Sequence, residues 1–146
     1  MSKVMLSSRF GQTAIQGTVV HGRKIGRKLG FPTANIDSHD EQLENGVYGV
    51  RVLLNGKEYT GIMNVGVKPT FDSNVSRTIE VHLLDFVNDI YGESLECHVL
   101  FKVRNEQKFP SIVHLKQQIM NDILYVKQTL KRLKSFNENN REIHAL

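Results

Sequence analysis

The chain has one cysteine, Cys97, in 146 residues, so it cannot form an internal disulfide bond. It has no apolar run near the roughly 18 residues that a membrane-spanning helix needs. The N-terminus, Met1 to Phe10, lacks the charged start and long apolar stretch of a secretory signal. Hydrophobic content of 40% and charged content of 23% are ordinary for a globular protein. These features exclude a disulfide-rich secreted protein and a membrane protein, and they predict a cytoplasmic location.

Several common functional motifs are also absent. No G-x-x-x-x-G-K-[ST] occurs, and no G-x-G-x-x-G opens a helix after a strand, which argues against a Walker or Rossmann nucleotide site. The six histidines are scattered without an H-E-x-x-H spacing, so we expect no zinc site. Cys97 alternates in phase with Leu95 and Val99, which predicts a small buried residue rather than a nucleophile.

The most informative segment that is present runs from Gly17 to Ile36. Its glycines recur at every fourth position: Gly22, Gly26 and Gly30. Four cations lie among them: Arg23, Lys24, Arg27 and Lys28. Glycines let backbone amides approach an anion without an intervening Cβ, and the cations add counter-charge. This combination predicts a site for nucleotide phosphates.

Two neutral oxygen ligands follow the glycines. Pro32 fixes its own φ and favours extended geometry at the preceding Phe31. Thr33 and Asn35, two residues apart, can then point to the same side of an extended segment. A hydroxyl and an amide oxygen are hard ligands, so they predict Mg²⁺ held jointly with phosphates and water.

The remaining pattern is β-rich and then helical. Strand-like segments occur at about 14–21, 47–54, 57–66, 78–86 and 94–103. Asn55-Gly56 is a two-residue hairpin signal between two of them. From Ser111, a potential N-cap, apolar residues recur at helical spacing: Ile112, Leu115, Ile119, Ile123, Val126, Leu130 and Leu133. The order of elements predicts an antiparallel barrel closed by a C-terminal helix over about 111–134, with 135–146 as a polar tail.

Glu80 is the candidate group for orienting and deprotonating an alcohol. On the predicted strand it shares a face with Thr78 and His82, opposite Ile79 and Val81. An exposed strand glutamate is more often a solubility device than a catalytic group, so position alone leaves its role open.

Several blocks of the sequence resemble a known family. The block G-x-V-V-x-G-x-x-x-G-R-x-L-G-F-P-T-A-N over 17–35 closely resembles the signature of riboflavin kinase, the flavokinase module of bacterial bifunctional FAD synthetases. Further matching blocks follow in family order at 46–50, 63–71, 80–86, 89–93 and 104–109. The resemblance covers about 14 to about 125, nearly the whole chain.

The resemblance implies a six-stranded antiparallel closed barrel with a C-terminal helix. It implies an ATP:riboflavin 5′-phosphotransferase, which converts riboflavin and Mg²⁺-ATP to FMN and ADP. Glu80 matches the family's general base toward the riboflavin 5′-hydroxyl. Thr33 and Asn35 match the ligands of Mg²⁺ and the phosphates. The remaining matched residues are Gly22, Gly26, Lys28 and Gly30 at the phosphates, and Arg104 beside the flavin, where a surface ion pair is the competing interpretation.

These matches divide the chain into a leader over 1–13, a riboflavin kinase domain over 14–134 with its barrel over about 14–104, and the tail over 135–146. Only about 13 residues precede the kinase block, so we expect no FAD synthetase activity. We expect a monomer. The net charge of +4 is modest and no recognition motif accompanies it, which argues against a nucleic-acid partner.

Two alternatives remain open. The barrel could be a flavin-binding regulatory module with little or no turnover that contacts RNA through its basic C-terminal helix. It could also be a kinase for another alcohol, with the same phosphate site. Conversion of riboflavin to FMN separates the first alternative from the enzyme, and substrate competition separates the second.

Overall fold

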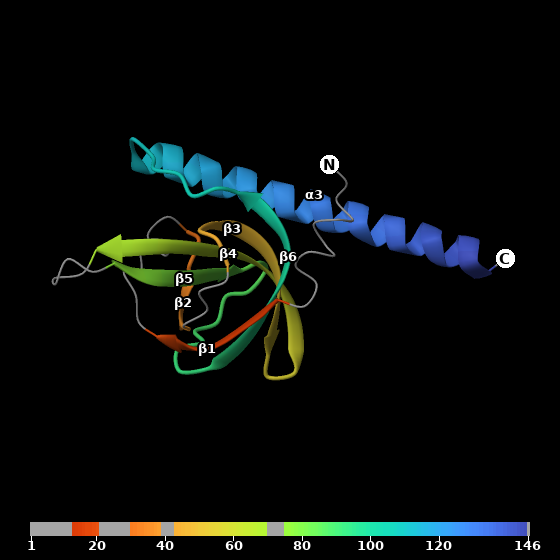
Figure 1. Ribbon diagram of the computed structural model, residues 1–146, viewed down its shortest axis with the longest axis horizontal. Coiled ribbons are helices and arrows are strands. Elements are labelled where there is room, and N and C mark those ends of the chain that lie inside the picture. Colours follow the sequence, from red (N-terminus) through yellow and green to blue (C-terminus); the bar gives the residue numbers. More distant parts are fainter. Residues whose placement is uncertain (1–12, 21–29, 39–42, 70–74, 146) are drawn as a thin grey trace. The chain divides into compact units, whose positions relative to one another are not determined.

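The computed structural model describes residues 13–20, 30–38, 43–69 and 75–145 (Figure 1). The chain consists of two compact units, Met1–Lys108 and Phe109–Leu146. The first contains six strands: β1 (Ala14–Val20), β2 (Ala34–Asp37), β3 (Gly46–Leu54), β4 (Lys57–Pro69), β5 (Val75–Leu83) and β6 (Ser94–Arg104). The second contains helix α3 (Ile112–Ala145). Among the described residues, no helix combines the length and apolarity that crossing a membrane requires.

The six strands close into a barrel in the order β1-β2-β5-β4-β3-β6 (Figure 1). Every neighbouring pair is antiparallel, and β6 pairs with both β3 and β1 to complete the ring. The predicted fold class is therefore confirmed. The strand-like segments of the sequence do not include β2, because only four residues belong to it and they follow the loop that contains Pro32.

The predicted hairpin joins β3 to β4. Leu54 and Lys57 are cross-strand partners, and Asn55 and Gly56 form the connection with φ of 51° and 78°. Both residues tolerate positive φ, and a two-residue turn of this kind matches the right-handed twist of the flanking strands. The turn fixes the register of β3 against β4.

Other strand boundaries differ from prediction. The sequence predicts strands over 57–66 and 78–86, whereas β4 continues to Pro69 and β5 covers Val75–Leu83. β5 ends early because Asp85 has a φ of 56°, outside the strand region. Leu84 at the strand end still donates its backbone N–H to the Thr60 carbonyl.

The barrel interior is filled by alternate residues from every strand. Ile15, Ile36, Val50, Met63, Val81 and Cys97 are among the buried members of this core. Residues of the opposite parity therefore face outward. One outward site is closely covered within the barrel unit: the Phe101 ring lies over Gly49, where an added Cβ would come within 2.5 Å of the ring.

Helix α3 begins as predicted. The Ser111 carbonyl accepts a hydrogen bond from the Leu115 N–H at 3.1 Å, and the Ser111 hydroxyl accepts one from the His114 N–H at 3.4 Å. The helix continues to Ala145, so the predicted polar tail is helical through that residue. The segment 112–145 has no glycine or proline to stop it. Val126 of the apolar stripe is buried, whereas Ile112 is 65% exposed.

Candidate active site

Three polar residues lie side by side on adjacent strands. Asn35 on β2 is the cross-strand partner of Glu80 on β5, and Glu80 is in turn the partner of Asn64 on β4. Directly opposed residues of antiparallel strands have Cβ atoms about 4.5–5.5 Å apart and project to the same face. Asn35, Glu80 and Asn64 therefore form an amide–carboxylate–amide row, which we call the polar row.

The polar row is on the outside of the barrel. Ile79 and Val81, which flank Glu80 in sequence, are 3% and 1% exposed and belong to the interior core. Glu80 has the opposite parity and is partly exposed. The predicted alternation along this strand is confirmed.

The register line through the polar row continues to Arg104. Val47 on β3 is the partner of Asn64 on one side and of Arg104 on β6 on the other. Four strand spacings separate Asn35 from Arg104, which amounts to roughly 19 Å along the curved sheet. The Arg104 Nη1 donates to the Asn105 carbonyl at 3.2 Å. In the closed barrel, however, β5 and β6 are three strand positions apart in either direction, so the register alone does not bring Arg104 close to Glu80.

The predicted phosphate-binding residues are described in part. Gly30 is exposed and has a φ of 86°, a conformation that favours glycine. Thr33 lies one residue before β2, so Asn35 is within the strand ladder and Thr33 is just outside it. The candidates Gly22, Gly26 and Lys28 lie outside the described residues.

A hydrogen bond joins the segment before β2 to the strand that carries Glu80. The His82 Nδ1 is 2.7 Å from the Pro32 carbonyl oxygen. The rings of His82 and Phe31 meet edge-to-face, with centroids 5.9 Å apart and planes at 89°. The alternation of the sequence predicts His82 on the Glu80 face but indicates no role for it.

A second carboxylate lies beside the polar row. Gly66 and Thr78 are cross-strand partners on the same face, two positions from Asn64 and Glu80. An added Cβ at Gly66 would lie 2.8 Å from Glu106 Oε1 and 3.7 Å from Thr78 Oγ1. Glu106 has no distinctive pattern in the sequence; it follows β6 by two residues, and the fold of the chain brings it to this face.

Comparison with known proteins identifies the family. A family model described as riboflavin kinase matches residues 11–130. The chain belongs to the riboflavin kinase family. It is 48% identical over 130 residues to the "RNA-binding riboflavin kinase RibR" of Bacillus subtilis, with 89% of the chain and 56% of that relative covered. It is 43% identical over 117 residues to the bifunctional riboflavin kinase/FMN adenylyltransferase of Escherichia coli K12, with 79% of the chain and 37% of the relative covered.

A solved structure shows the same relationship. The riboflavin kinase of Trypanosoma brucei is 26% identical and superposes with a TM-score of 0.57, over 81% of this chain and 79% of that one. The chain thus spans about half of the length of the Bacillus subtilis relative and about a third of the Escherichia coli relative. It spans most of the length of the Trypanosoma brucei kinase.

The donor set of this riboflavin kinase family member fits magnesium. Within the described ranges, no three His, Cys, Asp or Glu residues gather as a metal cluster. Thr33 and Asn35 instead offer a hydroxyl and an amide oxygen. Mg²⁺ keeps several waters and takes few protein ligands when phosphates are present, so two neutral oxygens are compatible with it.

The Cys97 thiol has no part in this chemistry. It is fully buried in the barrel core. Burial raises the pKa of this thiol from 9.0 to about 12, and the neighbouring Glu96 carboxylate adds to the increase. Because the thiolate is the nucleophilic form, Cys97 is inert near neutral pH, as the sequence predicts.

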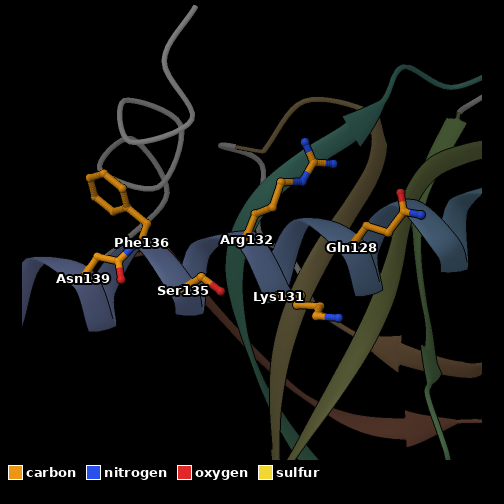
Figure 2. Close-up of a pocket in the computed structure, with 6 residues that line it drawn as sticks. All are labelled: Gln128, Lys131, Arg132, Ser135, Phe136 and Asn139. Carbon is orange, nitrogen blue, oxygen red and sulfur yellow. The ribbon is translucent and has the colours of Figure 1, made fainter.

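A separate hollow lies along α3. It is lined by Gln128, Lys131, Arg132, Ser135, Phe136 and Asn139. Figure 2 shows Gln128, Arg132 and Phe136 projecting to the same side of the helix. The hollow contains none of the residues predicted for the kinase site.

Proposed function

We propose that this chain is a riboflavin kinase that transfers the γ-phosphoryl group of ATP to the 5′-hydroxyl of riboflavin. The observation that carries the proposal is the direct pairing of Asn35 with Glu80 in the barrel wall. It puts a candidate ligand of the metal–phosphate group within one strand spacing of a candidate base. Membership of the riboflavin kinase family supports the same reaction.

In this proposal Glu80 accepts a hydrogen bond from the riboflavin 5′-hydroxyl and takes its proton as the oxygen attacks the γ-phosphorus. The bond from the γ-phosphorus to the β,γ-bridging oxygen breaks in line, which releases ADP. Phosphoryl transfer depends mainly on positioning and on stabilisation of charge. A moderately basic carboxylate is therefore sufficient.

The other residues bind and orient. Thr33 and Asn35 hold Mg²⁺ and phosphate oxygens, and Gly30, with the glycines and Lys28 of the preceding segment, holds the remaining phosphates. Bound Mg²⁺ supplies neutralisation of the phosphate charge. Arg104, at the far end of the register line, contacts the flavin, since a guanidinium can stack on a planar ring.

The direct test is to incubate the chain with riboflavin, ATP and Mg²⁺ and to separate FMN from riboflavin by fluorescence-detected chromatography. We expect FMN that depends on both ATP and Mg²⁺. Tight flavin binding without FMN would instead support a regulatory flavin-binding module. Other vitamin or sugar alcohols, added as competitors, test whether riboflavin is the preferred acceptor.

An RNA partner is the second candidate function, against the expectation from net charge. The Bacillus subtilis relative is described as RNA-binding, and α3 has a suitable charge pattern. Between 112 and 137 the only carboxylate is Asp122, which is 4% exposed. The cations of that stretch are all exposed: Lys116, Lys127, Lys131, Arg132 and Lys134.

The hollow on α3 adds groups that single-stranded RNA uses. Phe136, 47% exposed, offers a ring on which a base can stack, and Gln128 offers an amide for its edge. Lys131 and Arg132 can contact phosphates. The test is fluorescence anisotropy with a labelled single-stranded RNA over a salt series. We expect binding that weakens with salt and with Lys131→Gln/Arg132→Gln, while FMN formation is unchanged; salt-independent or absent binding removes this candidate.

A further inference from the structure

Thr33 lies just outside the strand pairing of the barrel. The ladder between β2 and β5 pairs Ala34 with Val81, Asn35 with Glu80 and Ile36 with Ile79, so Ala34 is its first residue on β2. Thr33 precedes β2 and has no cross-strand partner in that ladder. A metal ligand must nevertheless be held close to its productive geometry for phosphoryl transfer. Some other contact has to fix the Phe31-Pro32-Thr33 segment against β5.

His82 makes that contact. Its Nδ1 is 2.7 Å from the Pro32 carbonyl oxygen, the group directly before the Thr33 nitrogen. A carbonyl can only accept, so the Nδ1 must carry the proton and donate. The imidazole also makes an edge-to-face contact with the ring of Phe31, the residue that precedes Pro32.

His82 lies on the same strand, β5, as the candidate base. His82 is two residues from Glu80 and therefore shares its outward face. The register that pairs Asn35 with Glu80 would, one pleat further, bring Thr33 opposite His82. The two candidate metal ligands on one segment thus lie across from the candidate base and the histidine on the other.

We propose that His82 is a positioning residue for phosphoryl transfer: its hydrogen bond to the Pro32 carbonyl keeps Thr33 and Asn35 in register with Glu80. The proposal rests on the proposed kinase function. In this proposal His82 acts through the Pro32 carbonyl, by orienting the segment that carries Thr33, and takes no part in proton transfer to the substrate. Its removal therefore loosens the metal–phosphate side of the site and leaves the flavin side in place.

The kinetic test compares His82→Leu with His82→Asn. The asparagine side-chain amide can replace the Nδ1 donor, whereas leucine cannot. We expect His82→Leu to lower kcat/KM for Mg²⁺-ATP by about 10- to 100-fold, the usual effect of losing a group that orients a metal ligand. The KM for riboflavin should change by less than about twofold, and His82→Asn should recover most of the loss. His98→Asn, on β6, is the matched control and should behave as wild type.

A second measurement needs no turnover. Nitrogen-15 NMR of the histidine rings should show a proton on the His82 Nδ1, and His82→Leu should shift the Thr33 amide resonance. An unprotonated Nδ1, or an unshifted Thr33 amide, overturns the positioning role. So does equal damage by leucine and asparagine in folded variants, or a change in the riboflavin KM alone. Absence of FMN formation by the wild-type chain would instead contradict the kinase function and leave the NMR result to decide on His82.

Discussion

Asn35 on β2 and Glu80 on β5 are directly opposed partners in the barrel wall, although they are far apart in the sequence. The pairing places an amide and a carboxylate on the same outer face, with a second amide, Asn64, on the other side of Glu80. A metal-bound phosphate at Asn35 and an alcohol at Glu80 would then be neighbours. The barrel strands thus provide a rigid support for a reaction that depends on positioning.

Glu80→Gln should reduce turnover far more than it reduces nucleotide affinity. The amide keeps the size of the side chain but cannot accept the proton of the 5′-hydroxyl. General base catalysis contributes about 10²- to 10⁴-fold, so we expect kcat to fall within that range. Steady-state FMN formation measures this, and calorimetric titration with ADP should give a dissociation constant close to wild type. A fall in ADP affinity as large as the fall in kcat would contradict the assigned role.

Thr33→Ala and Asn35→Ala should both raise the Mg²⁺ concentration needed for half-maximal activity. Each removes one neutral oxygen ligand, and the phosphates and water cannot fully replace it. The flavin affinity, measured by quenching of riboflavin fluorescence, should stay the same. Thr18→Ala on the exposed face of β1 is a control that leaves both quantities unchanged. Magnesium dependence unaltered in both variants would place the metal elsewhere.

Gly17→Ala should destabilise the barrel. A Cβ at this position would lie 2.5 Å from the Asp37 carbonyl oxygen at the end of β2. Backbone cannot move aside as a flexible side chain can, so we expect a loss of about 1–3 kcal/mol in the free energy of unfolding. Urea denaturation followed by circular dichroism measures the loss. An unchanged denaturation midpoint would show that β1 and β2 are farther apart at Gly17 than the structure shows.

Cys97 should be unreactive toward a thiol reagent in the native state at neutral pH and reactive in urea. Burial raises its pKa in the folded state from 9.0 to about 12. The folded state therefore holds the proton more tightly than the unfolded state does, so this contribution to stability is complete below pH 9 and is lost as the pH rises toward 12. Cys97→Ala should remove that part of the alkaline loss of stability. Rapid native labelling at pH 7 would contradict the burial.

Local sequence signals predicted the local features correctly. Asn55-Gly56 specified its hairpin, Ser111 its helix start, and alternation around Glu80 the outward face of β5. The roles of Thr33, Asn35 and Glu80 came from the family resemblance, because an exposed strand glutamate alone has no distinctive pattern. Long-range register could not be read from the sequence, so Asn64, Glu106 and the contact of His82 with Pro32 were found only in the structure.

Boundaries were predicted less well for physical reasons. β2 has only four residues, which is too short for a periodic pattern. β5 ends before Asp85, which has a positive φ; because the residue there is not glycine, the sequence does not indicate this turn. Helix α3 passes the predicted end near 134 because polar side chains do not stop a helix in the absence of glycine or proline.

The most direct test of the site is a crystal structure of the chain with ADP, Mg²⁺ and FMN together. We predict Mg²⁺ at about 2.0–2.1 Å from oxygens of Thr33 and Asn35. We predict the ribityl 5′-oxygen of FMN within hydrogen-bonding distance of Glu80. A nucleotide and metal bound away from Thr33 and Asn35, or a flavin with its ribityl chain directed away from Glu80, would contradict the account.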